Sequence, residues 1–293
     1  MLSHDDIYLN LVKDILENGK ERNERTGTGM ISVFSRHLRF NISKQVPILT
    51  TKKMYWRSCV LELLWFLRGE TNTKTLSAQG VKIWNANTTR EFLDNRGLHH
   101  IPEGDMGPGY GFQWRHFGGN YGTETPGGFD QIKYILHELR TNPTSRRIFL
   151  SAWNPLQMKD MALPPCHVSA QFYVELPDNE GEQSELSCHF YQRSVDVFLG
   201  LPFNIASYTV LTYILASLCN MKPKELIVST GDTHIYKNHI EQMREQLNRI
   251  PYYSPILKIN PNIINKSIEE ITIQDFDVLE YQHHPAISGK MSA

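Results

Sequence analysis

The chain has 293 residues, of which 40% are apolar and 21% are charged, and its formal net charge is −1. This near-neutral balance excludes a general affinity for polyanions, so we expect no nucleic-acid partner, and any anion site must be a local cluster of basic residues. No uninterrupted apolar run reaches the roughly 18 residues of a membrane span, so we also expect no membrane association.

Cysteine usage indicates the compartment in which the protein works. Cys59, Cys166, Cys188 and Cys219 are far apart and form no C-x-x-C pair, and the N-terminus has no signal-like pattern. We therefore expect reduced thiols in a reducing, cytoplasmic compartment. No repeat, low-complexity block or Pro/Ser-rich linker interrupts the sequence, which favours a single domain over residues 1–293.

The first predicted elements are a helix and a strand joined by a polar loop. Ser3 caps the helix, whose apolar stripe ends at Gly19, and residues 31–40 form the strand. The loop, residues 22–29, places Arg25 among glycines and hydroxyl groups. Such a loop either binds an anion or is merely solvated.

A nearly continuous apolar segment, residues 55–68, predicts a buried helix that ends at Gly69. Glu62 lies in the middle of this helix. Because a buried carboxylate is costly, desolvation would raise its pKa toward the range that is useful for proton transfer. The alternative is a Glu62 on an exposed edge of the helix, or one paired with Arg57 or Lys53.

Residues 107–115 interleave glycines with aromatic side chains, which predicts a loop shaped around a flat ligand. The chain contains neither G-x-G-x-x-G nor G-x-x-x-x-G-K-[ST], so the fingerprints of NAD(P) and triphosphate binding are missing. An amphipathic helix over 129–140 follows, and Arg146 and Arg147 open a strand over 148–153. Neighbouring strand residues point to opposite faces, so the two arginines serve one site only with help from geometry or from another subunit.

Cys166 follows two prolines and precedes a strand. Pro164 and Pro165 fix φ and remove two backbone donors, and residues 168–174 alternate between apolar and polar side chains. A thiol on a stiff approach to a strand suits a nucleophile, provided that nearby cations or dipoles lower its pKa. The alternative is a structural cysteine beside a sheet.

Three further features follow in the C-terminal half. Asn204 precedes an apolar helix over 205–218, where it either caps the helix or uses its amide to read the imide edge of a pyrimidine. His234 and Tyr236 lie two residues apart in an extended segment and so share a face. No histidine pair has a partner at zinc spacing, so we expect no metal site.

Taken together, these residues predict a class of chemistry. Arg25, Arg146, Arg147 and Arg193 would suit a small dianion such as a phosphomonoester, because guanidinium groups match phosphate oxygens. The same charges would lower the pKa of Cys166. The residues alone therefore predict a thiol-dependent enzyme that acts on a small phosphorylated molecule.

Several motifs also carry a resemblance to a known family. They are R-T-G-T-G from Arg25, E-L-L-W-F-L from Glu62, S-R-R from Ser145, L-P-P-C-H from Leu163, R-S-x-D from Arg193, G-x-P-F-N-I-A-S-Y from Gly200 and G-D-x-H-x-Y from Gly231. From about Tyr8 to His284, the chain resembles the thymidylate synthases, in their stand-alone, folate-dependent form without a reductase domain.

The resemblance implies an α+β fold in which helices flank a large mixed sheet and two subunits pack sheet to sheet as a homodimer. It implies methylation of dUMP to dTMP, with methylenetetrahydrofolate as the one-carbon and hydride donor and with no metal or NAD(P). It also implies that the tail, about residues 283–293, closes over the bound ligands and excludes water.

Residue roles are implied in the same way. The catalytic residues would be Cys166, which adds to C6 of uracil, with Glu62, Asn204, Tyr110, Arg193, Asp196 and His167. The dUMP contacts would be Arg25, Arg193, Ser194, Asp196, Asn204, His234 and Tyr236, together with Arg146 and Arg147 of the partner subunit. The folate contacts would be Ile83, Trp84, Asn87, Leu163, Asp196, Leu199, Gly200, Phe203 and Ala293.

The tail departs from the family pattern at residues 282–285 and at Ala293, which bears on closure and folate affinity. Two alternatives to the synthase remain. One is a pyrimidine nucleotide hydroxymethylase on the same fold, in which water rather than hydride quenches the methylene adduct, although Asn204 argues against a cytosine substrate. The other is a non-catalytic nucleotide-binding descendant, whose signature would be loss of Cys166 or of an arginine, and neither is lost.

Overall fold

The computed structural model describes residues 2–23 and 27–291. The strands are β1 Lys20–Arg22, β2 Met30–Asn41, β3 Phe149–Ser151, β4 His167–Glu175, β5 Glu185–Asp196, β6 Lys222–Tyr236, β7 Ile256–Ile259 and β8 Phe276–Leu279. The α-helices are α1 His4–Asn18, α2 Trp56–Leu67, α3 Thr73–Ser77, α4 Arg90–Asn95, α5 Tyr110–His116, α6 Gln131–Thr141, α7 Gly200–Leu218 and α8 Ile240–Leu247.

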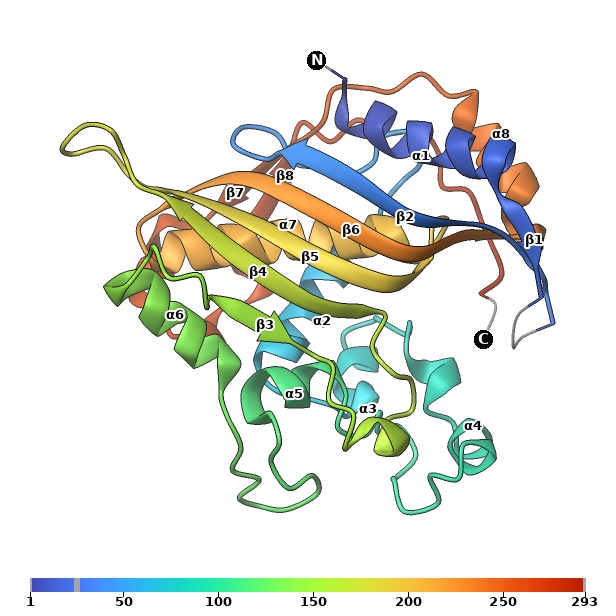
Figure 1. Cartoon of the computed structure of the whole chain (residues 1–293), viewed down its shortest axis with the longest axis horizontal. Helices are drawn as coiled ribbons and strands as arrows, with labels where there is room; N and C mark the ends of the chain where they lie inside the picture. The colour runs from blue at the N-terminus through green and yellow to red at the C-terminus, as the bar shows by residue number, and fades with distance from the viewer. Residues whose placement is uncertain (1, 24–26, 292–293) are drawn as a thin grey trace.

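A six-stranded mixed sheet forms the centre of the molecule, with the strand order β1-β2-β6-β5-β4-β3 (Figure 1). The β5–β6 pair is parallel, and the other pairs in this sheet are antiparallel. Strands β7 and β8 form a separate two-stranded sheet. The predicted α+β architecture, a large mixed sheet flanked by helices, is confirmed.

Alternation along the strands gives the sheet one buried and one open face. Phe172 in β4 and Phe190 in β5 are buried, whereas their neighbours Tyr173 and Tyr191 are 64% and 38% exposed. The open face also carries Phe34, which is 76% exposed. An open face with several large aromatic side chains is unusual for a surface that meets only water.

Helix α7 covers the buried face and lies behind β5 and β6 in Figure 1. The sequence predicted no apolar run of membrane-spanning length, but this helix of 19 residues is long and apolar enough. Because 78% of its most apolar window is buried within the protein, and α2 packs against it as well as the sheet, its composition is that of a core helix.

Other predicted elements are confirmed close to their expected bounds. Helix α1 begins after Ser3, whose side chain accepts from the backbone N–H of Asp6 in a capping box, and it ends before Gly19. The buried helix α2, the amphipathic α6 and the strands β2 and β4 also form where expected.

Three expectations were wrong. Most of residues 107–115 form helix α5 rather than a ligand-shaped loop, because residues 110–114 are all buried and pack as a short core helix. Helix α7 begins at Gly200, so Asn204 lies inside its first turns and is not its N-cap. Strand β3 begins at Phe149, and the two arginines before it lie in a turn.

Candidate active site

The sheet register gathers several of the predicted site residues at one end of the sheet. The carboxyl ends of the parallel strands β5 and β6 lie together, and the amino end of antiparallel β4 lies beside them. Asp196 is therefore paired with His234, and the Arg193 N–H donates to the Cys166 carbonyl over 2.9 Å. Tyr236 ends the neighbouring strand, opposite Met30.

Arg193 holds the segment that presents the thiol. Its Nε donates to the Pro165 carbonyl over 2.7 Å and its Nη2 to the Pro164 carbonyl over 3.0 Å. Its guanidinium also lies over the ring of Trp153, 5.6 Å from the centroid. This side chain thus fixes the proline segment and places a permanent positive charge beside Cys166.

The electrostatics of Cys166 differ from the sequence-based expectation. Burial raises the pKa of its thiol and outweighs the lowering effect of Arg193, and Asp196 raises it further. The expectation of a net lowered pKa is therefore wrong for this single chain. The physical reason is that, of the predicted arginines, only Arg193 lowers the Cys166 pKa among the residues that the structure describes.

An aromatic stack lies next to the thiol segment. The Cys166 N–H donates to the Tyr110 hydroxyl oxygen over 2.7 Å. The ring of Tyr110 stacks on that of His167 at 4.1 Å and 15°. The Nδ1 of His167 is in turn 3.0 Å from the hydroxyl of Tyr208. Helices α5 and α7 therefore position two tyrosines around one histidine beside the thiol.

The position of Tyr110 depends on the turn before α5. Gly107 has φ +73°, and a Cβ there would lie 2.2 Å from the Asp160 carbonyl oxygen. The Ala162 N–H donates to the Met106 carbonyl over 2.9 Å, which joins this turn to the approach to the proline segment. Glycine is required because both the backbone conformation and the space exclude a side chain.

Glu62 is buried, as one of the two sequence-based interpretations required. It is 7% exposed, and its Oε1 accepts from the indole Nε1–H of Trp84 over 2.7 Å. Burial raises the pKa of Glu62 to about 7, although the Trp84 hydrogen bond lowers it. The alternative pairing with Arg57 or Lys53 is not found among the hydrogen bonds of the described residues.

The carboxyl end of β6 carries His234 and Tyr236 on one face, as predicted. Their rings are 5.0 Å apart at 77°. The Nδ1 of His234 lies 3.1 Å from Oδ1 of Asp232, and the other oxygen of Asp232 accepts from Arg22 over 2.7 Å. The carboxylate of Asp232 therefore orients the buried His234 ring.

Most of the predicted folate residues belong to the start of α7 or to the segment that carries Trp84, and Leu163 precedes the two prolines. The Oδ1 of Asp196 accepts from the N–H groups of Phe198 and Leu199, which fixes the turn into α7. The ring of Trp84 lies 6.0 Å from that of Tyr110. Of this set, Asn87 is buried, and the others are half-buried: Ile83, Trp84, Leu163, Asp196, Leu199, Gly200 and Phe203.

Some predicted residues are not brought to the thiol. Arg146 and Arg147 are exposed beside β3, where the Gln171 amide donates to the Arg146 carbonyl over 3.3 Å. Gln171 is five residues along the strand from Cys166, a separation of roughly 15 Å. Arg25 and Ala293 lie outside the described residues. Ser194 is at the site, opposite Asp232 in the β5–β6 pair.

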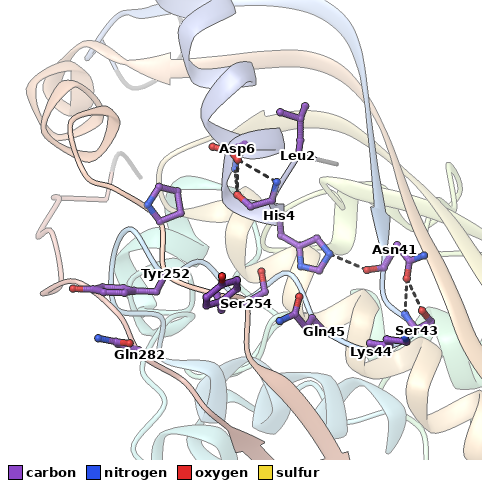
Figure 2. A pocket seen from close by; sticks show the side chains of 13 residues that line it. Leu2, His4, Asp6, Asn41, Ser43, Lys44, Gln45, Tyr252, Ser254 and Gln282 are labelled. Atoms are coloured by element: carbon purple, nitrogen blue, oxygen red, sulfur yellow. Dashed lines mark hydrogen bonds between the residues drawn. The ribbon is translucent and has the colours of Figure 1, made fainter.

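Figure 2 shows the residues that line a separate cavity of about 890 Å³. Its wall includes the start of α1 and Asn41. Asn41 is the last residue of β2, whereas Met30, the first residue of β2, lies near the thiol; the length of the strand places the two roughly 35 Å apart. His4 Nε2 donates to the Asn41 carbonyl over 2.8 Å, and Ser43 donates to the Asn41 side chain. None of the predicted site residues lines it.

Two residues and one bond in these contacts had no role from the sequence. Asp232 could have been found from strand spacing, since it lies two residues before His234 on the same face. Tyr208 could have been found from helical spacing, four residues after Asn204. The bond between Trp84 and Glu62 joins distant segments and left no local signal. Among the described residues, no group of three or more His, Cys, Asp or Glu could hold a metal ion.

Comparison with known proteins gives the context for this geometry. Residues 6–293 match the thymidylate synthase family. The chain belongs to the thymidylate synthase family. It is 50% identical over 294 residues to the thymidylate synthase of Saccharomyces cerevisiae, covering 97% of this chain and 96% of that protein.

Longer relatives match as well. The chain is 49% identical over 289 residues to the bifunctional dihydrofolate reductase-thymidylate synthase of Zea mays, covering 97% of this chain and 54% of that protein. It is 50% identical over 290 residues to the enzyme of the same name from Plasmodium chabaudi, covering 98% of this chain and 48% of that protein. The chain thus spans about half the length of these relatives. The family is one of folate-dependent methyltransferases of dTMP biosynthesis, so the predicted resemblance is confirmed.

Proposed function

We propose that this chain converts dUMP and methylenetetrahydrofolate to dTMP and dihydrofolate, with Cys166 as the nucleophile. The observation that carries the proposal is the placement of Cys166 beside the Arg193 guanidinium, at the end of the sheet where β4, β5 and β6 meet. Family membership over residues 6–293 supports the choice of substrates.

Cys166 begins the reaction by forming a bond from Sγ to C6 of the uracil ring. The addition makes C5 an enolate-like carbon, which bonds to the one-carbon unit of the folate and then loses its proton. The bond between the one-carbon unit and the folate nitrogen then breaks, which leaves a methylene group on C5, and hydride from the folate reduces this group to methyl. The folate therefore leaves as dihydrofolate without a nicotinamide. The bond from Sγ to C6 breaks as the product forms, and the thiol is regenerated.

Glu62 is the group that we assign to proton transfer. Its pKa of about 7 allows it to accept and release a proton near neutral pH. We infer that it relays protons through water to O4 of uracil and to the folate nitrogen. Asn204, inside the first turns of α7, presents an amide that can donate to and accept from the uracil edge.

Recognition of the remaining groups follows from their chemistry. Arg193, Ser194 and Arg25 would bind the phosphate, and His234 with Tyr236 would bind the ribose hydroxyl. Trp84, Asn87 and the start of α7 would line the folate site, with Tyr110 near C5 and His167 behind the thiol.

We further infer a homodimer in which each site is completed by Arg146 and Arg147 of the partner subunit. These arginines are exposed and too far from Cys166 of their own chain. The open sheet face carries exposed aromatic residues, among them Phe34, Tyr173 and Tyr191, which suits packing of one sheet against another. Partner arginines would also add the positive charge that Cys166 lacks in a single chain.

The chain is proposed to act as one domain whose tail closes over the ligands. The Arg249 guanidinium donates to the Pro285 carbonyl over 2.6 Å, and His284 Nε2 donates to the Ile250 carbonyl over 2.8 Å. These contacts hold residues 284–285 against the segment that follows α8, and His239 Nε2 donates to the Lys290 carbonyl over 2.9 Å farther along the tail. The four free cysteines support a reducing, cytoplasmic location.

A product assay tests the proposed function. The purified chain is incubated with dUMP and methylenetetrahydrofolate, and dTMP and dihydrofolate are quantified together. We expect equal amounts of the two products and none with Cys166→Ala, while Cys219→Ala, which changes the thiol at the C-terminal end of α7, away from Asn204, keeps activity. Hydroxymethyl product without dihydrofolate would instead establish the hydroxymethylase, and dUMP binding without any product would establish a non-catalytic descendant.

A further inference from the structure

A buried hydrogen bond behind the thiol connects His167 to helix α7. The Nδ1 of His167 lies 3.0 Å from the Tyr208 hydroxyl, and no described residue hydrogen-bonds to its Nε2. His167 is 8% exposed and Tyr208 is 3% exposed. Bulk water therefore does not compete for this bond, and the bond decides which ring nitrogen carries the proton.

The direction of the bond follows from the state of the two groups. Burial lowers the pKa of His167 to about 3 and raises the pKa of Tyr208 well above its ordinary value, so the ring is neutral and the hydroxyl is protonated. The Tyr208 hydroxyl has no other acceptor among the described residues. If Nδ1 donated, the buried O–H would have no partner, so the hydroxyl donates and the ring proton lies on Nε2.

The Tyr208 hydroxyl is held in place by its own packing. Its ring stacks on Phe190 at 4.1 Å and 5°, and its edge meets Trp114 at 6.4 Å and 63°. Tyr208 is four residues after Asn204 on α7, so the two side chains lie on the same side of the helix. One rigid helix thus sets both the amide and the hydroxyl relative to the thiol.

We propose that Tyr208 is a positioning residue, whose hydroxyl holds His167 in the Nε2–H tautomer. In this state the Nε2–H is a fixed donor, available to a water molecule or to a pyrimidine carbonyl once dUMP binds beside Cys166. The effect on turnover rests on the proposed function, whereas the tautomer itself is a property of the free protein.

The test combines histidine NMR with kinetics on the full chain. Ring nitrogens of 15N-histidine-labelled protein are correlated with ring carbon protons, a pattern that separates the two neutral tautomers. The His167 signal is identified by its loss in His167→Gln. Tyr208→Phe keeps the stack on Phe190 and removes only the hydroxyl. Tyr213→Phe is the matched control, because Tyr213 lies on the same helix and its hydroxyl donates to the Ile42 carbonyl over 2.6 Å.

We expect the Nε2–H tautomer in the wild type and in Tyr213→Phe, and a shift toward Nδ1–H in Tyr208→Phe. The kcat of Tyr208→Phe should fall roughly ten- to a hundredfold, as for other groups that orient a histidine through its second nitrogen, with a smaller change in KM for dUMP.

A wild-type Nδ1–H tautomer, or a loss of kcat with an unchanged His167 signal, would overturn the proposal. The wild-type spectrum decides the assignment even if Tyr208→Phe folds poorly. If the wild type did not turn over dUMP, the proposed function would be rejected. The NMR spectrum would still decide whether Tyr208 holds His167 in the Nε2–H tautomer.

Discussion

The carboxyl group of Glu62 is poised between two protonation states by its surroundings. Apolar neighbours in α2 raise its pKa to about 7, and the indole N–H of Trp84 opposes this by stabilising the ionised form. A carboxyl group with a pKa near the working pH can both donate and accept a proton during one turnover. Glu62 therefore has the property that a relay requires.

This balance predicts how activity responds to pH. The profile of kcat/KM should have an inflection near pH 7 that is absent from Glu62→Gln. Trp84→Phe removes the donor that lowers the Glu62 pKa, so the inflection should move to higher pH. The control is Trp65→Phe, since the buried indole N–H of Trp65 has no hydrogen-bond partner in the described part of the chain. An inflection that stays in place in Trp84→Phe would contradict the assignment.

The same pKa predicts a cost in stability. Because the pKa of Glu62 is raised on folding from 4.5 to about 7, its stabilising contribution is complete below pH 4.5 and is lost as the pH rises through 7. The loss is about 3 kcal/mol. Glu62→Gln should remove this part of the decline, so its Tm should exceed that of the wild type more at pH 8 than at pH 5. An equal difference at both pH values would indicate that Glu62 is ionised throughout.

At the scale of elements, the turn before α5 places Tyr110 against the thiol segment. Gly107 and Gly97 have nearly the same φ, +73° and +74°, but a Cβ at Gly107 would meet the Asp160 carbonyl whereas one at Gly97 meets nothing within 4 Å. The two glycines therefore separate the cost of the backbone conformation from the cost of the contact.

Alanine substitutions at the two positions exploit this difference. Gly97→Ala should destabilise the protein by about 1–2 kcal/mol, the cost of a left-handed alanine, and leave kcat unchanged. Gly107→Ala should cost about 1–3 kcal/mol more because of the clash, and its kcat should fall as Tyr110 shifts. Denaturant unfolding and steady-state kinetics measure both effects. Equal losses in the two variants would show that the contact with Asp160 does not position α5.

Elements with a clear period were predictable from the sequence, and those set by distant contacts were not. The stripe of α1 and the alternation of β4 are local patterns, and both elements form as expected. Helix α5 has no polar face, because residues 110–114 are all buried, so the period that identifies a surface helix is missing. Helix α7 begins before its apolar run because Pro202 is tolerated in the first turn, where its missing N–H is not needed.

On the scale of the whole molecule, the candidate site depends on long-range pairing. The thiol, Arg193 and His234 come together only through the register of β4, β5 and β6, which no local motif encodes; the family resemblance predicted their association. Arg146 and Arg147 remain at a distance from Cys166 of the same chain. Two exposed arginines in a turn away from the thiol are accounted for if the site is shared between subunits.

Mixed dimers test this sharing. Cys166→Ala and Arg146→Ala should each be nearly inactive alone. After mixing, half of the dimers are hybrids. In a hybrid, the subunit that keeps Cys166 receives Arg146 from the other subunit, so one of the two sites is intact. About a quarter of wild-type activity should therefore return. The control mixes Arg146→Ala with the double variant Cys166→Ala/Arg146→Ala, in which no intact site can form. No recovery, with hybrids captured through two different tags, would mean that each site is built within one chain.

The central claim is that the thiol of Cys166 bonds to a pyrimidine whose phosphate is held by arginines. Its most direct test is the intact mass of the protein after incubation with 5-fluoro-dUMP and methylenetetrahydrofolate, because fluorine cannot leave C5 as a proton does and the adduct is trapped. We predict a mass increase equal to both ligands, mapped by peptide sequencing to Cys166 and absent from Cys166→Ala. No mass increase, or an adduct on Cys59, Cys188 or Cys219, would contradict the assignment.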